Sequence, residues 1–116
     1  GVMDRLGLGY EDCRKINPSI VYCSATGYGP DGPYAHRPGQ DLLAQGIAGW
    51  DVMNATADGR PTLVAMSAID LLGAMYGAYG VLGALYHRLA TGEGQKVEIS
   101  LLDSAVAGLS ELGVPT

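Results

Sequence analysis

The sequence predicts an α/β fold, and three segments support this prediction. Ser19–Ser24 (SIVYCS) is rich in β-branched and aromatic residues and is too short for a helix, while Gln95–Ser100 (QKVEIS) alternates polar and apolar residues as a strand does. Between them lies Ser67–Ala90, a long apolar segment typical of a helix. Strands separated by helices are typical of α/β folds. The chain has 116 residues, 47% of them hydrophobic, which suits one domain with a buried core.

The first expected element in chain order is a short helix, Tyr10–Asn17, which ends before Pro18 because the residue preceding a proline avoids the helical conformation. The strand follows, and then comes a loop rich in glycine and proline, Ala25–Gln40. Within this loop Gly27–Gly32 (GYGPDG) matches the GxGxxG fingerprint of dinucleotide-binding proteins. That fingerprint has to open a helix, and the prolines prevent one, so we interpret it as a turn and not as a nicotinamide or flavin site.

The remainder of the chain is expected to hold three helices, one of which starts with an aspartate where the helix dipole favours it. One irregular segment and one extended segment are expected between the first and second of these helices. In chain order, the expected elements are the helix Asp41–Gly49, the irregular segment Trp50–Pro61 with a turn at Asp58–Pro61, the extended segment Thr62–Met66, the helix Ser67–Ala90 stopped by Gly92, the strand Gln95–Ser100 and the helix Leu101–Ser110.

Charge and cysteine content disfavour several classes of function. The formal net charge is -5 and the basic residues are scattered, apart from Arg14 and Lys15, so we expect no nucleic-acid partner. Cys13 and Cys23 form neither a CxxC pattern nor a disulfide framework, which favours a reducing compartment such as the cytosol, and a single bridge between them stays open. The chain opens with GVMDRLG, which resembles no signal peptide, and ends with GVPT, so we expect a piece of a longer protein.

The segment Leu71–Tyr86 carries no charge and contains Gly73 and Gly77 in GxxxG spacing, a pattern also found in membrane helices. A membrane span needs about 20 apolar residues, and this run is shorter and contains four glycines and three tyrosines. We therefore predict a packed core helix and no membrane partner. Gly73, Gly77, Gly80 and Ala84 are expected to form a small-residue face where another backbone approaches closely.

Two histidines and two aspartates are the titratable residues of interest. His36 and His87 have no further ligand at metal-binding spacing, so we predict no metal site. Asp41 and Asp70 each begin an expected helix, where an aspartate commonly caps the free amides. Asp70 has an apolar neighbourhood without a nearby basic residue, so we expect helix-end amides to hold its charge. Such a carboxylate can be a nucleophile, a base or only a cap, and the residue pattern leaves all three open.

The order and separation of three segments resemble the family III CoA-transferases. The resemblance covers the whole chain but a minority of a full-length family member. It implies that residues 1–116 are a fragment of the large Rossmann-like domain of such an enzyme. The three segments read GVMDRLGLGYEDCRKINPSIVYCSATGYGPDGPY, RPGQDLLAQGIAGW and SAIDLLGAMYGAYGVLGALYHRLATGEGQKVEISLLDSA.

The resemblance also implies roles for individual residues. The catalytic aspartate of the family falls on Asp70, whose carboxylate would attack an acyl-CoA thioester and form an aspartyl anhydride and then an aspartyl-CoA thioester. Arg5 would contact a phosphate of CoA, and Arg37 lies one position from a basic contact of the family. CoA would be a substrate and not a permanently bound cofactor. Three further matched positions would lie beside the CoA thiol and the acyl group: Gly39, Gln40 and Asp41.

The sequence leaves two alternatives open. The related α-methylacyl-CoA racemases need an acid/base histidine in a GHD loop, and here the same place holds Gln40, which has no titratable proton. The sequence therefore favours a transferase over an isomerase. The second alternative is that the isolated piece only packs and does not catalyse. The resemblance further implies an interlocked homodimer that uses acyl-CoA and carboxylate substrates in the cytoplasm, or in the mitochondrial matrix of a eukaryote.

Overall fold

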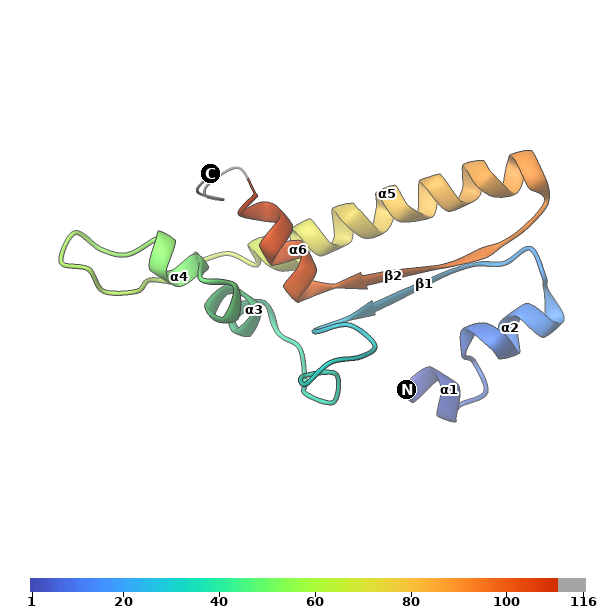
Figure 1. Cartoon of the computed structure of the whole chain (residues 1–116), viewed down its shortest axis with the longest axis horizontal. Coiled ribbons are helices and arrows are strands. Elements are labelled where there is room, and N and C mark those ends of the chain that lie inside the picture. Colours follow the sequence, from blue (N-terminus) through green and yellow to red (C-terminus); the bar gives the residue numbers. More distant parts are fainter. Residues whose placement is uncertain (111–116) are drawn as a thin grey trace.

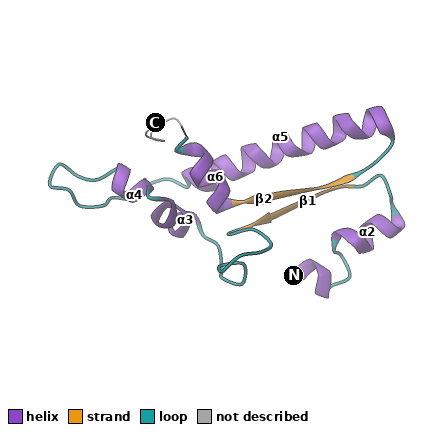
Figure 2. Ribbon diagram, in the orientation of Figure 1, coloured by secondary structure: helices purple, strands orange, loops and turns teal. Residues whose placement is uncertain are grey.

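The structure is a computed structural model, and it describes residues 1–110. Two strands, β1 (Val21–Thr26) and β2 (Gln95–Ser100), form a parallel pair in which Val21 lies opposite Gln95 and Thr26 lies opposite Ser100. The long helix between them, α5 (Ala68–Thr91), runs along one side of the strands in Figure 2. The predicted α/β architecture is therefore confirmed.

The other helices surround this unit at its two ends. Figure 1 shows the first two helices on the side of the strands away from α5, and the third and fourth beyond the carboxyl ends of the strands. The sixth follows β2 directly and crosses near the start of α5. Their bounds are α1 Val2–Arg5, α2 Tyr10–Ile16, α3 Asp41–Ala48, α4 Trp50–Met53 and α6 Leu101–Gly108.

Most expected boundaries hold within two residues, but some expectations need correction. The single turn α1 was not predicted, and α4 replaces the start of the segment expected to be irregular, Trp50–Pro61. The strand β1 begins two residues later than expected. The reason is local, because the backbone amide and hydroxyl of Ser19 both donate to Oδ1 of Asn17, at 3.1 and 2.8 Å, and this turn keeps Ser19 out of the sheet.

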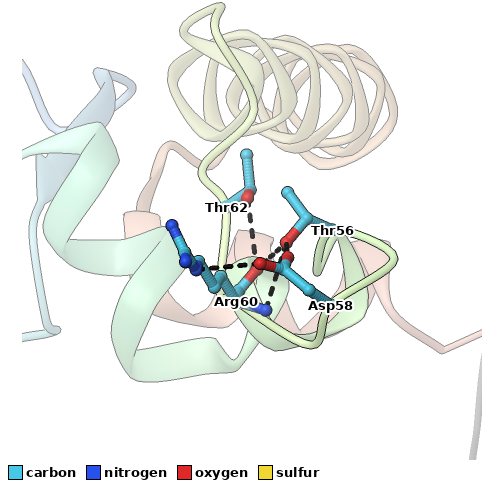
Figure 3. Close-up of polar contacts among 4 residues, drawn as sticks. All are labelled: Thr56, Asp58, Arg60 and Thr62. Carbon is cyan, nitrogen blue, oxygen red and sulfur yellow. Dashed lines mark hydrogen bonds and ion pairs between the residues drawn. The ribbon is translucent and has the colours of Figure 1, made fainter.

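A compact polar turn connects α4 to the segment before α5, and Figure 3 shows its side chains. The amide of Thr56 donates to the carbonyl of Arg60 at 2.9 Å, and Gly59 at the tip has a φ of +81°. Nε of Arg60 forms an ion pair with Asp58 at 2.9 Å. The turn expected at Asp58–Pro61 lies two residues earlier, because the amide of Gly59 donates to the carbonyl of Thr56 at 2.8 Å. Beyond it, residues 62–64 belong to no helix or strand, and the expected extended segment Thr62–Met66 is interrupted by a bend at residues 65 and 66.

The buried core is small and sits where α3, α5 and α6 meet. Ala44, Ile69 and Ala105 are each at most 1% exposed. The indole of Trp50 covers this cluster, and its Nε1 donates to the carbonyl of Ala105 at 2.9 Å. The core therefore fixes the first turn of α5 against two other helices, which is also the position of Asp70.

The small residues of α5 face β2 and α6, but the expected close approach of another backbone is wrong for the described residues. A Cβ added to Gly80 would lie 2.6 Å from Cγ1 of Val97, and one added to Gly73 would lie 3.3 Å from Leu101. The neighbours in close contact are thus side chains. The other face of α5 is exposed, and large apolar residues such as Leu82 and Leu89 project from it. The predicted packing is therefore confirmed for one face of α5 only. The helix is also long and apolar enough to cross a membrane, by length and composition alone.

Candidate functional site

Asp70 lies in the first turn of α5 at the junction of two cavities. One cavity, of about 450 Å³, is mostly apolar and is lined by small residues of α5 and by Ile99. The other, of about 570 Å³, is lined by Gln40 and Asp41 and by the segment Leu63–Ser67. Asp70 lines both cavities and is exposed. Asp70 is therefore accessible and borders both cavities.

The amides at the start of α5 are bound by Asp41 and not by Asp70. Oδ2 of Asp41 accepts the amide protons of Ile69 at 2.7 Å and of Asp70 at 3.0 Å. Among residues 1–110, no donor lies within hydrogen-bonding distance of the Asp70 carboxylate. The expectation that helix-end amides hold the charge of Asp70 is therefore wrong for the described part of the chain. Asp41, which is 5% exposed, is the carboxylate in that situation.

Gln45 completes the support beneath the site. Its side chain is fully buried, and its Nε2 donates to Oδ1 of Asp41 at 2.5 Å. Its Oε1 accepts the amide proton of Val64 at 2.9 Å, and Nε2 also lies 3.4 Å from the carbonyls of Val64 and Met66. One side chain of α3 thus holds the segment that leads into α5.

A close crossing of two glycines positions the loop that leads to Asp41. A Cβ on Gly39 would overlap the Cα of Gly27, and a Cβ on Gly27 would overlap the Cα of Gly39. The carbonyl of Gly27 also accepts the amide proton of Leu102 at 3.0 Å. As expected, the segment Gly27–Gly32 opens no helix: it bends, with φ of +88° at Gly29 and +90° at Gly32, and no helix begins in the described chain between Thr26 and Asp41.

The two arginines expected to contact CoA lie apart from Asp70. Arg5 ends α1, and Arg37 places its guanidinium over the ring of Tyr34 at 4.6 Å. Neither lines the two cavities beside Asp70. Of the predicted site residues, the structure brings Gln40, Asp41 and Asp70 to one cavity, with Gly39 just before them in the chain. Within residues 1–110 no group of three or more metal-binding side chains is present.

Comparison with known protein families places the chain. The sequence model described as CoA-transferase family III matches residues 1–114, which is nearly the whole chain. The chain belongs to this family.

Individual members of CoA-transferase family III are similar to this chain over most of its length. Acetyl-CoA:oxalate CoA-transferase of Acetobacter aceti is 41% identical over 110 residues, covering 94% of this chain and 28% of the relative. Succinyl-CoA:glutarate CoA-transferase of Mus musculus is 38% identical over 112 residues, covering 97% of this chain and 26% of the relative. The chain therefore spans roughly a quarter of the length of the curated relatives that it matches.

A solved structure agrees with the fold. The crystal structure of a CAIB/BAIF family protein from Brucella suis superposes with a TM-score of 0.87 at 36% identity, and the match covers 96% of this chain and 29% of that protein. The predicted relation to CoA-transferase family III and the predicted α/β fold are both confirmed.

In this CoA-transferase family member, Gln45 is the site residue that sequence reasoning missed. A signal was present, because Asp41 and Gln45 are four residues apart and therefore lie on one face of α3. Ala44 on the same face is also buried. Two polar residues on the apolar face of a short helix indicate a buried hydrogen bond, since polar groups that lose water need a partner.

Proposed function

We propose that the protein transfers coenzyme A between an acyl-CoA thioester and a free carboxylic acid, with Asp70 as the nucleophile. The observation that carries this proposal is the state of the Asp70 carboxylate, which is exposed at the junction of two cavities and accepts no hydrogen bond within residues 1–110. A carboxylate that is not engaged as a helix cap is available to attack an electrophile. The names of relatives that act on oxalate or glutarate and on CoA thioesters support the same reaction class.

The proposed chemistry divides one acyl transfer into steps that balance. The Asp70 carboxylate attacks the thioester carbonyl and the carbon–sulfur bond breaks. The CoA thiolate departs, and the acyl group remains on Asp70 as a mixed anhydride. The thiolate then attacks the aspartyl carbonyl and releases the donor acid as a carboxylate, which leaves an aspartyl-CoA thioester. An acceptor carboxylate attacks this thioester and displaces the thiolate. The thiolate finally attacks the acceptor carbonyl of the new anhydride and frees Asp70.

Each of these steps passes through an oxyanion that hydrogen-bond donors stabilise. We propose Gln40 and the backbone at Gly39 as neighbours of the reacting thioester, because Gln40 lines the same cavity as Asp70. Arg5 and Arg37 are proposed as cationic contacts of the CoA phosphates, with support from the resemblance alone. Asp41 lines the same cavity, and both of its carboxylate oxygens accept hydrogen bonds from the protein, so we propose its backbone and not its carboxylate as a neighbour of the acyl group.

The test traps the covalent intermediate. The full-length protein is incubated with an acyl-CoA, without an acceptor acid, and hydroxylamine is then added. We expect hydroxylamine to convert Asp70 to a hydroxamate, which mass spectrometry of peptides locates. Asp70→Asn should abolish both the adduct and turnover, while Asp103→Asn, which changes a first-turn aspartate of α6, should retain both.

Two results would overturn the proposal. One is turnover without an Asp70 adduct. The other is exchange of deuterium into the α-carbon of the acyl group without any adduct, which indicates a racemase. The homodimer and the cytoplasmic or mitochondrial location stay predictions that rest on the resemblance.

A further inference from the structure

We propose that Asp41, held in place by Gln45, is a positioning residue for Asp70. This inference rests on the proposed function, because it concerns how Asp70 is presented to the thioester. Asp41, which lies on the neighbouring helix α3 of the same chain, accepts the hydrogen bonds that a residue at the N-cap of α5 would normally accept. As a result, the carboxylate of Asp70 stays free for chemistry.

The hydrogen bonds at the start of α5 show this substitution. Ser67 occupies the N-cap position, but its side chain makes no capping hydrogen bond. A capping side chain normally accepts from the second or third amide of the helix. In α5 these are the amides of Ile69 and Asp70, and both donate to Oδ2 of Asp41, which lies 28 positions before Ile69. The cap thus comes from another helix.

The capping carboxylate is itself firmly oriented. Asp41 is 5% exposed, and its other oxygen accepts from Nε2 of Gln45 at 2.5 Å. Gln45 cannot rotate its amide freely, because Oε1 already accepts the amide proton of Val64 at 2.9 Å. Three donors converge on Asp41, and an ionised carboxylate is the form that accepts three hydrogen bonds without offering a proton.

The geometry explains why two aspartates are needed. An aspartate in the first helical turn would ordinarily interact with the free amides of its own helix. Asp41 occupies those amides, so Asp70 gains nothing by folding back onto them. The bond from the Asp70 amide to Asp41 also fixes the backbone from which the Asp70 side chain projects. Accurate positioning matters greatly, because a displacement of about 1 Å can reduce a rate about 10²-fold.

The test compares Asp41→Asn with wild type in the full-length protein. An asparagine that keeps its oxygen toward the α5 amides turns its NH₂ group toward Nε2 of Gln45, which places donor against donor. We expect kcat and the rate of hydroxamate formation at Asp70 to fall by about 10²-fold, with KM for acyl-CoA nearly unchanged. Hydrogen exchange of the amides of Ile69 and Asp70 should accelerate.

Two further variants separate positioning from general stability. The double variant Asp41→Asn with Gln45→Glu restores an acceptor opposite the asparagine NH₂ and should recover part of kcat. Asp103→Asn alters a comparable first-turn aspartate of α6 that hydrogen-bonds its own N-cap residue, Ser100. It should affect stability but neither kcat nor exchange at Ile69.

The possible results are distinguishable. If wild type forms no hydroxamate at Asp70, the proposed function fails. If wild type forms it and Asp41→Asn forms it at the same rate, only the positioning role is overturned. A loss of kcat no larger than that of Asp103→Asn would also overturn it. Unchanged hydrogen exchange of the Ile69 amide in Asp41→Asn would show that Asp41 does not cap α5.

Discussion

Gly27 and Gly39 show how narrowly a single residue is constrained near the site. Their Cα atoms approach so closely that a methyl group on either would overlap the other backbone. Neither glycine is selected for a left-handed conformation, since neither has a positive φ. The constraint is therefore steric, and it fixes the path of the chain one residue before Gln40.

Gly39→Ala should consequently displace the loop beside Asp70. Overpacking of this kind typically costs about 1–3 kcal/mol, and here backbone has to move, so we expect a lower melting temperature and slower hydroxamate formation. Gly46→Ala is a matched control within α3, where an added Cβ meets nothing within 4 Å. It should stabilise the helix by about 0.5–1 kcal/mol. Thermal unfolding of the full-length protein measures both, and equal stability of the two variants would contradict the expectation.

The two aspartates show what single residues in a sequence can and cannot reveal. That Asp41 and Asp70 each begin a helix could be predicted, because both follow loops and precede helical spacing. Which of them binds the amides of α5 could not, because the answer depends on how α3 packs against α5. Local pattern predicts a cap at a residue's own helix, whereas this cap is tertiary.

At the scale of elements, α5 offers a direct test of its packed face. Gly80→Ala places a Cβ 2.6 Å from Cγ1 of Val97, a β-branched side chain with little freedom to move. Overpacking of about 1–3 kcal/mol should exceed the gain in helix propensity of about 1 kcal/mol, so the variant should be less stable than wild type.

Gly83→Ala is the matched control for Gly80→Ala, since an added Cβ at Gly83 meets nothing within 4 Å. Here only the helix propensity changes, and we expect a gain of about 0.5–1 kcal/mol. Urea unfolding of the full-length protein compares the two variants. Equal effects at Gly80 and Gly83 would show that α5 does not pack on β2 as described.

The success of prediction differed between elements for physical reasons. The helix α5 was predicted within one residue at each end, because it is long, apolar and closed by Gly92 at a φ of +80°. The short helix α4 was missed, since it follows Gly49 directly and has only four residues. Elements of one turn carry too few residues to show a period.

At the scale of the whole molecule, the chain buries too little surface for its size. It exposes 7901 Å², whereas a folded monomer of this mass exposes roughly 6,000 Å². Its radius of gyration is 16.9 Å, compared with about 13 Å for a compact domain of this length. Composition predicted a buried core, yet the apolar residues that would fill it lie largely on exposed faces such as that of α5.

We therefore expect residues 1–116, produced alone, to have a low free energy of unfolding. Urea unfolding followed by circular dichroism should be broad, and the dye ANS should bind strongly to the exposed apolar face of α5. The double variant Leu82→Gln/Leu89→Gln should bind less ANS, because both leucines are exposed and apolar in the wild type. A sharp transition without ANS binding would contradict this expectation and would show that the chain is stable by itself.

The pairing of β1 with β2 also affects the order of events during biosynthesis. Val21 pairs with Gln95, and these partners are 74 positions apart. A ribosome adds about 5–20 residues per second, so β1 emerges roughly 4–15 s before its partner strand exists. Throughout that interval the backbone amides and carbonyls that pair with β2 lack that partner, and nascent-chain chaperones or premature strand pairing compete for them. The long connection that contains α5 therefore makes the pairing of β1 with β2 a late event in the synthesis of this chain.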